Sequence, residues 1–402
     1  MNILLICNKS PWPPREGGPI AMNAMVEGLL NAGHKVKVLA INSYKYFIDP
    51  QSVPSDYSEK TQIELVYMDL KVRPMHALLN LLSSKSYHVQ RFISDDFADA
   101  IRKILQNNEF DVIQLETLFV TPYIDLIRKH SKAAIFLRAH NIEHLIWERL
   151  YKREKNSLKK FYLGHLSRTL KKFELRVLTK LDGIIAITQK DADFFKRFVP
   201  AEKVIAIPFG ILPEIINKYL KVNIEPVQNT IFHLGSMNWM PNQEGIQWFL
   251  KEVWPGLSVR NKDLVFRLAG REMPVWLLNR QTGNVIIDGE VPDAVEYMKK
   301  YRIMVVPLFS GSGIRIKIIE GMLAGCAIIT TRTGAEGINC QDGKHLIFAE
   351  NSEEYIQAIE RLVNDQALVD EIGNNASAFV RENHNNQKLM FQLESFYTAQ
   401  RN

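Results

Sequence analysis

The stretch of this sequence with the most readable chemistry is VVPLFSGSGIRIKIIEGMLAGCAIITTRTGAEGI, residues 305–338. We expect a strand to end at Pro307 and Gly325 to stop the helix that follows. The loop before that helix presents free backbone N–H groups to an anion, aided by the helix dipole; the loop residues concerned are Ser312, Gly313 and Ile314. Arg315 and Lys317 add full positive charges beside it. The pattern predicts a diphosphate site.

Glu320 stands one turn further along the same predicted helix. Its neighbours in the sequence are apolar or glycine, so the carboxylate needs a partner if it is buried. Two sugar hydroxyls would satisfy its two oxygens. The alternative is a salt bridge to a neighbouring helix.

Two segments of the first half also carry polar groups past the end of an apolar run. Gly17 and Gly18 precede a predicted helix, where bare backbone amides suit an anionic oxygen. The alternative is a flexible turn that only starts the helix. The spacing G-x-G-x-x-G is absent after the first strand, which disfavours an NAD enzyme.

His140 follows the apolar run AIFLRA, with Arg138 and Asn141 beside it. The carboxyl end of a parallel strand is where ligands of such sheets bind. A histidine there can donate a hydrogen bond to a sugar hydroxyl or to a phosphate group of a ligand. The alternative is a strand-end histidine bonded to a backbone carbonyl.

Asp191 and Asp193 have the D-x-D spacing of metal-dependent transferases. However, Thr188 and Asp191 form a capping pair at the start of a predicted helix, and carboxylates in a first turn favour the helix dipole. We therefore predict a structural role for this pair and no required metal.

Short β-branched runs alternate with helical patterns throughout, which predicts βαβ units and parallel sheets covered on both faces. In the first half the expected strands are 2–7, 34–41, 63–68, 111–116, 134–139 and 183–188; in the second half they are 203–208, 230–235, 264–270, 284–289, 303–308, 326–331 and 345–349.

The 402 residues exceed the usual size of one core, so two domains are expected. We predict an α/β protein with two doubly wound, Rossmann-like parallel-sheet domains facing a central cleft. The predicted divisions are an N-terminal domain (1–207), a proline-containing linker or hinge (208–228), a C-terminal domain (229–384) and a C-terminal helix packing back across the junction (385–402).

Cysteine usage and the lack of long apolar runs indicate the cellular compartment of the protein. Only three cysteines occur, without C-x-x-C spacing, which indicates free thiols in a reducing compartment. The N-terminus lacks a basic region, and no run of about 18 apolar residues occurs. The expected location is cytoplasmic.

Residues 152–180 carry ten Lys or Arg against Glu154 and Glu174, a net charge of 10 − 2 = +8. The segment also has an apolar stripe at helical spacing. It is either a solvated helix face or a surface for anionic lipid or a lipid-phosphate acceptor, giving peripheral contact with the inner face of the membrane. No motif for nucleic acid accompanies the charge.

Several motifs together resemble the group 1 family of retaining glycosyltransferases. Its helix Glu-Ala-Met-Ala-x-Gly is similar to 320–325, and its following strand and glycine-rich turn are similar to 330–337. HLGSMNWMPNQEGIQWFLKEVWP (233–255) and LAGRE (268–272) resemble its earlier C-domain segments. The similarity runs along essentially the whole chain. The resemblance implies the GT-B fold, in which 1–207 would be the acceptor-binding domain and 229–384 the nucleotide-sugar-binding domain.

The resemblance also implies roles. Glu320 would hold the donor ribose, Gly18 the diphosphate and His140 the donor sugar. The matching turns add Gly235, Ser236 and Arg271 to the donor-binding residues, alongside Gly17 and the loop before Arg315.

The chain departs from the common family pattern in two places. The first Glu of the E-x7-E pattern falls at Ser312, and the usual Arg and Lys after the first C-domain strand are replaced within GSMNWMPN. Arg315 and Lys317 are the natural substitutes for these cations, and Arg271 is the next candidate.

The combined expectation is a retaining glycosyltransferase of hexosyltransferase type. It would move a sugar from a nucleotide diphosphate donor, its only cofactor-like ligand, to an unidentified carbohydrate or lipid-linked acceptor in cell-surface polysaccharide or glycolipid synthesis. The alternatives are a nucleotide-sugar epimerase of the same architecture and a non-catalytic subunit.

Overall fold

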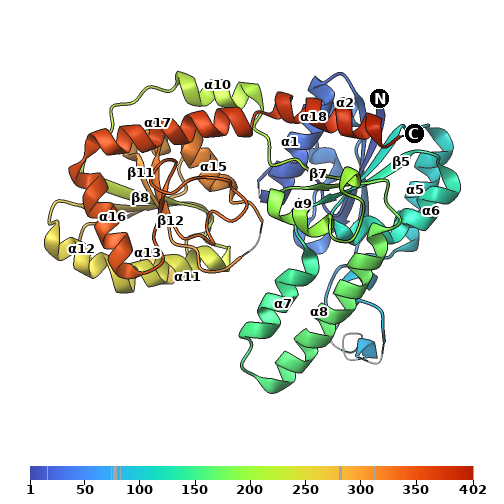
Figure 1. Ribbon diagram of the computed structural model, residues 1–402, viewed down its shortest axis with the longest axis horizontal. Helices are drawn as coiled ribbons and strands as arrows, with labels where there is room; N and C mark the ends of the chain where they lie inside the picture. Colours follow the sequence, from blue (N-terminus) through green and yellow to red (C-terminus); the bar gives the residue numbers. More distant parts are fainter. Residues whose placement is uncertain are drawn as a thin grey trace. The chain divides into compact units, whose positions relative to one another are not determined.

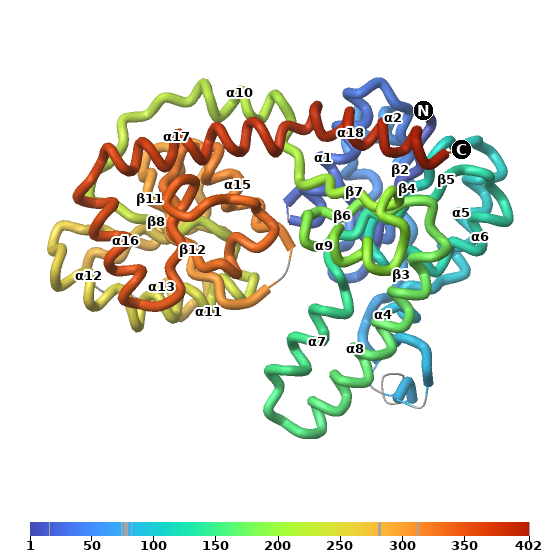
Figure 2. Tube along the Cα trace, in the orientation of Figure 1, coloured from blue at the N-terminus to red at the C-terminus, as the bar shows by residue number. Residues whose placement is uncertain are grey.

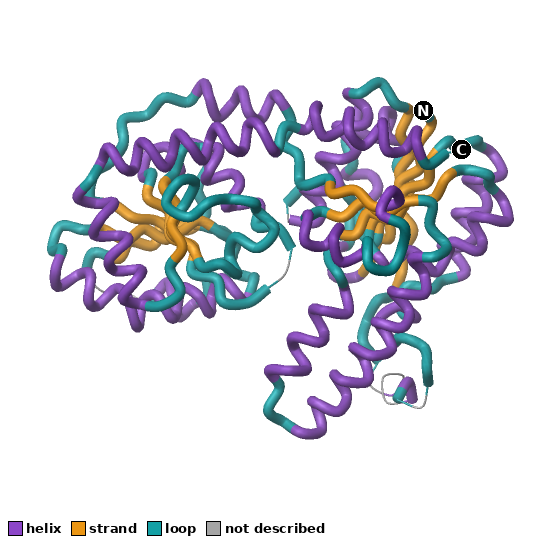
Figure 3. Tube along the Cα trace, in the orientation of Figure 1, coloured by secondary structure: helices purple, strands orange, loops and turns teal. Residues whose placement is uncertain are grey.

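The computed structural model of the chain describes residues 1–15, 17–73, 75, 79–81, 83–279, 283–311 and 313–401. These residues divide into two units. Unit 1 comprises Met1–Gly210 together with Asn386–Asn402, and unit 2 comprises Ile211–Asn385 (Figure 1). Each unit contains one parallel sheet with helices around it, as Figure 3 shows.

Unit 1 holds a seven-stranded parallel sheet in the order β3-β2-β1-β4-β5-β6-β7. Its strands are β1 (Asn2–Cys7), β2 (Lys35–Ser43), β3 (Glu64–Met68), β4 (Val112–Glu116), β5 (Ala134–Ala139), β6 (Gly183–Ala186) and β7 (Val204–Ala206). Its helices are α1 (Gly17–Asn31), α2 (Ser55–Thr61), α4 (Tyr87–Gln90), α5 (Asp95–Asn107), α6 (Ile124–His130), α7 (Glu143–Arg153), α8 (Ser157–Leu178), α9 (Gln189–Phe195) and α18 (Asn386–Ala399).

The sheet of unit 1 is buried on both faces because successive side chains of a strand point to opposite sides. In β1, Leu4 and Ile6 pack with α5 and α6, whereas Ile3, Leu5 and Cys7 pack with α1 and α18. This explains why β1 is an almost continuous apolar run.

Helix α18 returns the chain to unit 1 at its C-terminus. Figure 2 shows this red end of the trace running beside α1, and residues of both helices share one core cluster. The close approach requires Gly28, since a Cβ there would lie 2.2 Å from Oδ1 of Asn386. Both ends of the chain therefore belong to the same unit.

Unit 2 holds a six-stranded parallel sheet in the order β10-β9-β8-β11-β12-β13. Its strands are β8 (Thr230–Leu234), β9 (Val265–Ala269), β10 (Val285–Gly289), β11 (Ile303–Val306), β12 (Ala327–Thr330) and β13 (Ile347–Phe348). Its helices are α10 (Pro213–Lys221), α11 (Met240–Trp248), α12 (Trp254–Arg260), α13 (Val275–Leu278), α14 (Ala294–Tyr301), α15 (Ile316–Leu323), α16 (Ser352–Asn364) and α17 (Gln366–Asn383).

Both sheets reverse strand order beside their first strand. β1 has β2 on one side and β4 on the other, and β8 has β9 on one side and β11 on the other. At such a switch point the connections leave on opposite faces, and the carboxyl ends of the strands are the usual binding place. The functional residues should therefore be sought after β1, β4 and β5 in unit 1 and after β8, β9 and β11 in unit 2.

Three expectations about the elements need correction. Strand β7, which we counted with the second half, pairs with β6 and completes the first sheet. The segment 208–228 contains α10, whose Ile216 and Tyr219 are buried, because this proline-containing segment still has an apolar helical face. The basic segment 152–180 is not one helix, since Glu154 and Asn156 leave the helical conformation between α7 and α8.

Helices α7 and α8 form a hairpin that projects from the rest of unit 1 (Figure 1). The half of α8 nearest the sheet packs into the core through Leu170, Val177 and Leu178. The opposite end is exposed. Among the described residues, no helix combines the length and apolar character needed to cross a membrane.

Candidate functional site

Lys317 is the central cation of the candidate site in unit 2. It lies in the first turn of α15, and its Nζ donates at 2.6 Å to Oδ1 of Asn242, which lies in the first turn of α11. The Nζ also lies 3.4 Å from Nε2 of His233. Among the described residues, no acidic side chain forms a salt bridge with this ammonium.

His233 is held in one tautomer by its other ring nitrogen. Nδ1 lies 2.8 Å from the carbonyl of Val305 in the neighbouring strand, which accepts its proton. Burial, and then the charge of Lys317, lowers the pKa of His233 well below its usual range. The ring is therefore neutral and presents the Nε2 lone pair to the ammonium.

Gly235 leaves room for this cation. A Cβ at this position would lie 3.0 Å from Nζ of Lys317, 3.0 Å from Nδ2 of Asn242 and 3.2 Å from Nε2 of His233. A larger residue would displace at least one of these groups. The turn is fixed further because the Nδ2 of Asn242 donates to the carbonyl of Ser236 at 2.7 Å.

Arg315 lies at the N-cap of α15 and is buried. Its guanidinium carbon is 5.5 Å from the ring centre of Trp239, and Nη1 donates to the carbonyl of Gly313. Both predicted substitute cations thus lie against the turn in which the usual Arg and Lys are missing. Burial, and then the charge of Arg315, lowers the pKa of Lys317 to about 7.

Two glycines shape the loop before α15. Gly311 and Gly313 have φ angles of 105° and 78°, which residues with a Cβ adopt only with strain. Gly313 and Ile314 are half-buried, and Ser312 lies outside the described residues. The loop therefore depends on its glycines.

Glu320 is half-buried on α15, and its carboxylate has no hydrogen bond or ion pair with the described residues. Burial raises the pKa of Glu320 to about 7. The salt bridge that we considered as an alternative is therefore not found within the described part of the chain.

Arg271 belongs to the loop after β9, whose backbone runs beside the loop after β8. Its carbonyl accepts from the N–H of Met237 at 2.9 Å. Gly270 makes this contact possible, because a Cβ there would lie 1.8 Å from the carbonyl oxygen of Gly235. The loops after three adjacent strands, β9, β8 and β11, thus converge in unit 2.

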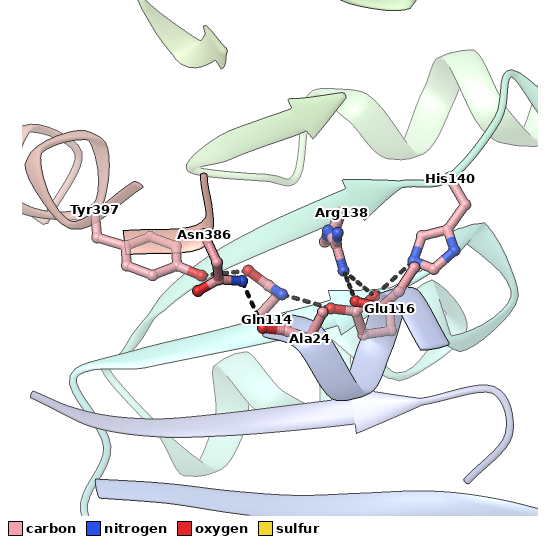
Figure 4. Close-up of polar contacts among 8 residues, drawn as sticks. Ala24, Gln114, Glu116, Arg138, His140, Asn386 and Tyr397 are labelled. Carbon is pink, nitrogen blue, oxygen red and sulfur yellow. Dashed lines mark hydrogen bonds and ion pairs between the residues drawn. The ribbon is translucent and has the colours of Figure 1, made fainter. Parts of the chain in front are cut away.

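The candidate site in unit 1 is built around a buried carboxylate that sequence reasoning missed. Glu116, at the end of β4, accepts from Nε2 of His140 at 2.6 Å (Figure 4). Nη1 of Arg138 lies 3.4 Å from the same Oε2 atom, and Nε2 of Gln114 donates to Oε1 at 2.5 Å. A strand VIQLE with two polar residues at alternate positions was the available signal.

The pKa of Glu116 reflects opposing effects. Burial raises it, but the charge of Arg138 and the hydrogen bonds from His140 and Gln114 outweigh burial and hold the pKa of the Glu116 carboxyl below its usual value. The ionised carboxylate can only accept hydrogen bonds, so Nε2 of His140 carries a proton. His140 therefore bonds a carboxylate rather than a backbone carbonyl. Arg138 is buried within β5, beside Glu116 of the neighbouring strand.

Gly17 and Gly18 are the first residues of α1, so the helix begins at the pair rather than after it. Lys9 lies against them, since its Nζ would be 3.1 Å from a Cβ on Gly18. The N-terminus of α1 thus has a neighbouring cation that the sequence did not single out.

Thr117 is a second residue that sequence reasoning missed. Its φ of 83° is strained for a β-branched residue, and its buried hydroxyl has no hydrogen-bond partner in the described part of the chain. No sequence signal pointed to it.

The D-x-D segment is part of a helix start. Thr188 caps α9, and its side chain accepts from the N–H of Asp191 at 3.0 Å, as predicted. Within the described ranges, no group of three or more His, Cys, Asp or Glu residues is arranged to hold a metal ion.

Comparisons with known proteins agree with the fold and the motifs. The family model Glycosyltransferase Family 4 matches residues 17–214, and the model Glycosyl transferases group 1 matches residues 228–365. Together with two parallel-sheet α/β units, these matches define a glycosyltransferase of the GT-B fold. The chain belongs to the group 1 family of glycosyltransferases. These matches favour transfer over the epimerase alternative.

The similar proteins cover nearly the full length of the chain. An uncharacterized 44.6 kDa protein in the cps region of Klebsiella pneumoniae is 23% identical over 97% of this chain and 98% of its own. Sucrose-phosphate synthase from Thermosynechococcus elongatus is 15% identical, with a TM-score of 0.69 over 99% of this chain and 98% of the synthase. Anabaena HepE, solved in complex with UDP, is 14% identical, with a TM-score of 0.63 over 99% of this chain and 100% of HepE.

Proposed function

We propose that this chain is a retaining glycosyltransferase that uses a nucleoside diphosphate sugar to extend a cell-surface polysaccharide on the inner face of the membrane. The K. pneumoniae relative in a cps region supports this setting. The observation that carries the proposal is Lys317, a half-buried cation without an acidic partner among the described residues, held at the carboxyl edge of the sheet.

In the proposed reaction, unit 2 binds the nucleoside diphosphate. Lys317, Arg315 and the N–H groups of the loop at 313–314 would face the two phosphates, and Glu320 would accept hydrogen bonds from two ribose hydroxyls. We assign supporting contacts to the turn at Gly235 and Ser236. Arg271 is the next candidate for a phosphate-binding cation if Arg315 or Lys317 does not have this role.

The chemistry requires stabilisation of the departing phosphate. The acceptor hydroxyl forms a bond to the anomeric carbon while the bond from that carbon to the diphosphate breaks, and the hydroxyl proton leaves with the diphosphate. Fixed positive groups lower the energy of the charge that develops on the leaving oxygen. We propose that His140 hydrogen-bonds the donor sugar and that Gly17 and Gly18 assist with an anionic oxygen. No protein nucleophile or metal is invoked.

The donor can be identified by thermal shift against a panel of nucleotide sugars, because a ligand of the native state raises its melting temperature. Calorimetry with UDP and with uridine then tests the phosphate site. Arg315→Ala and Lys317→Met should each weaken UDP binding roughly tenfold to a hundredfold, since a hydrogen bond to a charged group contributes about 1.5–3 kcal/mol. Uridine binding should not change.

Lys251→Met is the matched control, because Lys251 is an exposed lysine of unit 2 paired with Glu252. It removes the same charge without touching the site. If Lys317→Met weakens UDP and uridine equally, or neither, the lysine does not bind phosphate. If a nucleotide sugar binds but is never turned over with any acceptor, the non-catalytic alternative gains.

We also propose a peripheral membrane contact at the hairpin tip, residues 150–161. Three apolar side chains are exposed there, Leu150 by 46%, Leu158 by 83% and Phe161 by 64%. Five Lys or Arg accompany Glu154, a net charge of 5 − 1 = +4. Apolar side chains among cations suit the interface of an anionic bilayer. The proposed contact is limited to this tip, and does not extend over the whole basic segment 152–180, because the later turns of α8 pack into unit 1.

A further inference from the structure

A chain of buried hydrogen bonds joins the C-terminal helix to His140. The hydroxyl of Tyr397 on α18 donates to Oε1 of Gln114, whose Nε2 donates to Oε1 of Glu116, and Oε2 of Glu116 accepts from His140 (Figure 4). All of these residues belong to unit 1, although Tyr397 and Gln114 are 283 positions apart in the sequence.

Every bond in this chain has one possible direction. The Glu116 carboxylate is ionised and only accepts, so Gln114 must turn its amide N–H toward it. The amide oxygen of Gln114 then faces Tyr397, which must donate. Burial, and then the charge of Glu116, raises the pKa of Tyr397, so the phenol keeps its proton.

The same logic fixes His140. Its Nε2–H is committed to Glu116, which leaves Nδ1 as the ring atom without a partner among the described residues. The ring side chain is 12% exposed. Nδ1 is therefore the atom that His140 offers to a ligand.

Ring packing and a hydrogen bond between helices hold Tyr397 in place. Its ring packs edge-on against Phe136 at 4.7 Å, and α18 is tied to α1 by the Nδ2 of Asn386, which donates to the carbonyl of Ala24 at 2.9 Å. Packing alone would be served by phenylalanine, because a fully buried hydroxyl is costly unless it is hydrogen-bonded. The hydroxyl of Tyr397 thus has a role beyond packing.

We infer that Tyr397 is a positioning residue for His140, acting through Gln114 and Glu116. The C-terminal helix would then complete the sugar-side site of unit 1 rather than only cover its sheet. The link to activity rests on the proposed role of His140, whereas the hydrogen-bonded relay itself does not.

The decisive measurement is the ring ¹⁵N and N–H spectrum of His140, assigned by comparison with His140→Gln. In the wild type, Nε2 should carry the proton. Tyr397→Phe removes one oxygen atom, frees the Gln114 amide to rotate and should shift the His140 Nε2–H resonance. Tyr57→Phe is the matched control. Tyr57 lies in the same core cluster, but its buried hydroxyl has no hydrogen-bond partner within the described ranges.

Activity gives a second readout once a donor is known. Tyr397→Phe should lower kcat about threefold to tenfold, as expected for one lost hydrogen bond, with UDP affinity unchanged. Gln114→Leu should give the same spectral change by interrupting the relay at its centre. An unchanged His140 spectrum in both variants would overturn the inference. If the His140 spectrum shifts but His140→Ala keeps full activity, the relay is supported and the catalytic role of His140 is contradicted.

Discussion

In unit 1 the buried carboxylate of Glu116 is surrounded by hydrogen-bond donors and a guanidinium, whereas in unit 2 the carboxylate of Glu320 has no partner among the described residues. The partners of Lys317 that the structure describes, His233 and Asn242, are likewise neutral. In the first site the charges of Glu116 and Arg138 stabilise one another. The second holds charges that a ligand with phosphates and hydroxyls would compensate.

This difference separates structural from ligand-dependent charge. Removing one partner of a buried ion pair leaves the other charge buried without a counterion, which destabilises the protein. Removing an uncompensated charge relieves that same cost. A substitution should therefore cost much more stability in the first site than in the second.

Glu116→Ala should have the largest effect. It leaves the Arg138 guanidinium buried without a counterion, which costs about 3–5 kcal/mol of the free energy of unfolding. Lys317→Met should change stability by less than about 1 kcal/mol, because no ion pair is broken. Urea unfolding followed by a probe in each unit measures both. Equal destabilisation by the two variants would remove the contrast.

His140→Ala tests whether the site around Glu116 in unit 1 also serves catalysis. We expect kcat to fall roughly tenfold to a hundredfold, with the donor dissociation constant changed much less, because the interaction is strengthened in the transition state. Steady-state kinetics and calorimetry with the donor found in the panel measure the two terms. Parallel losses of activity and melting temperature would indicate a core histidine instead.

The pH dependence of donor binding sharpens the comparison from the side of unit 2. The pKa of Glu320 is raised to about 7, so below pH 7 it protonates and loses acceptor capacity. The pKa of Lys317 is lowered to about 7, so above pH 7 it loses its charge. Affinity should therefore be greatest near pH 7 and fall by up to about tenfold per pH unit on each side.

Variants assign the two limbs of that profile. Glu320→Gln should weaken binding at pH 7 with the fold intact and abolish the acidic limb. Lys317→Arg should flatten the alkaline limb, since arginine stays charged. A pH-independent dissociation constant in the wild type, measured by calorimetry from pH 5.5 to 8.5, would show that neither group titrates on binding.

The hairpin tip should give the smallest effect. Lys159→Gln should weaken association with phosphatidylglycerol-containing vesicles about fivefold, because one cation near an anionic surface contributes about 1 kcal/mol. Leu158→Ser should also weaken it, whereas Phe391→Ser should not, although Phe391 is 71% exposed on α18. Cosedimentation at low and high salt checks this. Equal binding to neutral vesicles would leave a solvated hairpin.

The sequence by itself determined the local elements and the family. The strands of both sheets, the helix start at Thr188 and the end of α15 before Gly325 follow from hydrophobic runs, capping residues and glycine. The group 1 resemblance followed from motifs between 230 and 350. These features depend on near neighbours in the chain, which is why they can be read from it.

Tertiary structure alone decided the partners. Nothing in the sequence indicates that Tyr397 would meet Gln114, that Glu116 would hold His140, or that β7 would close the first sheet. The same holds for Lys317. Its proposed role came from a missing motif, but its contacts with His233 and Asn242 exist because α15 lies against β8 and α11. Hydrogen bonds and burial depend on proximity in space, and the spatial order of the strands in each sheet sets that proximity.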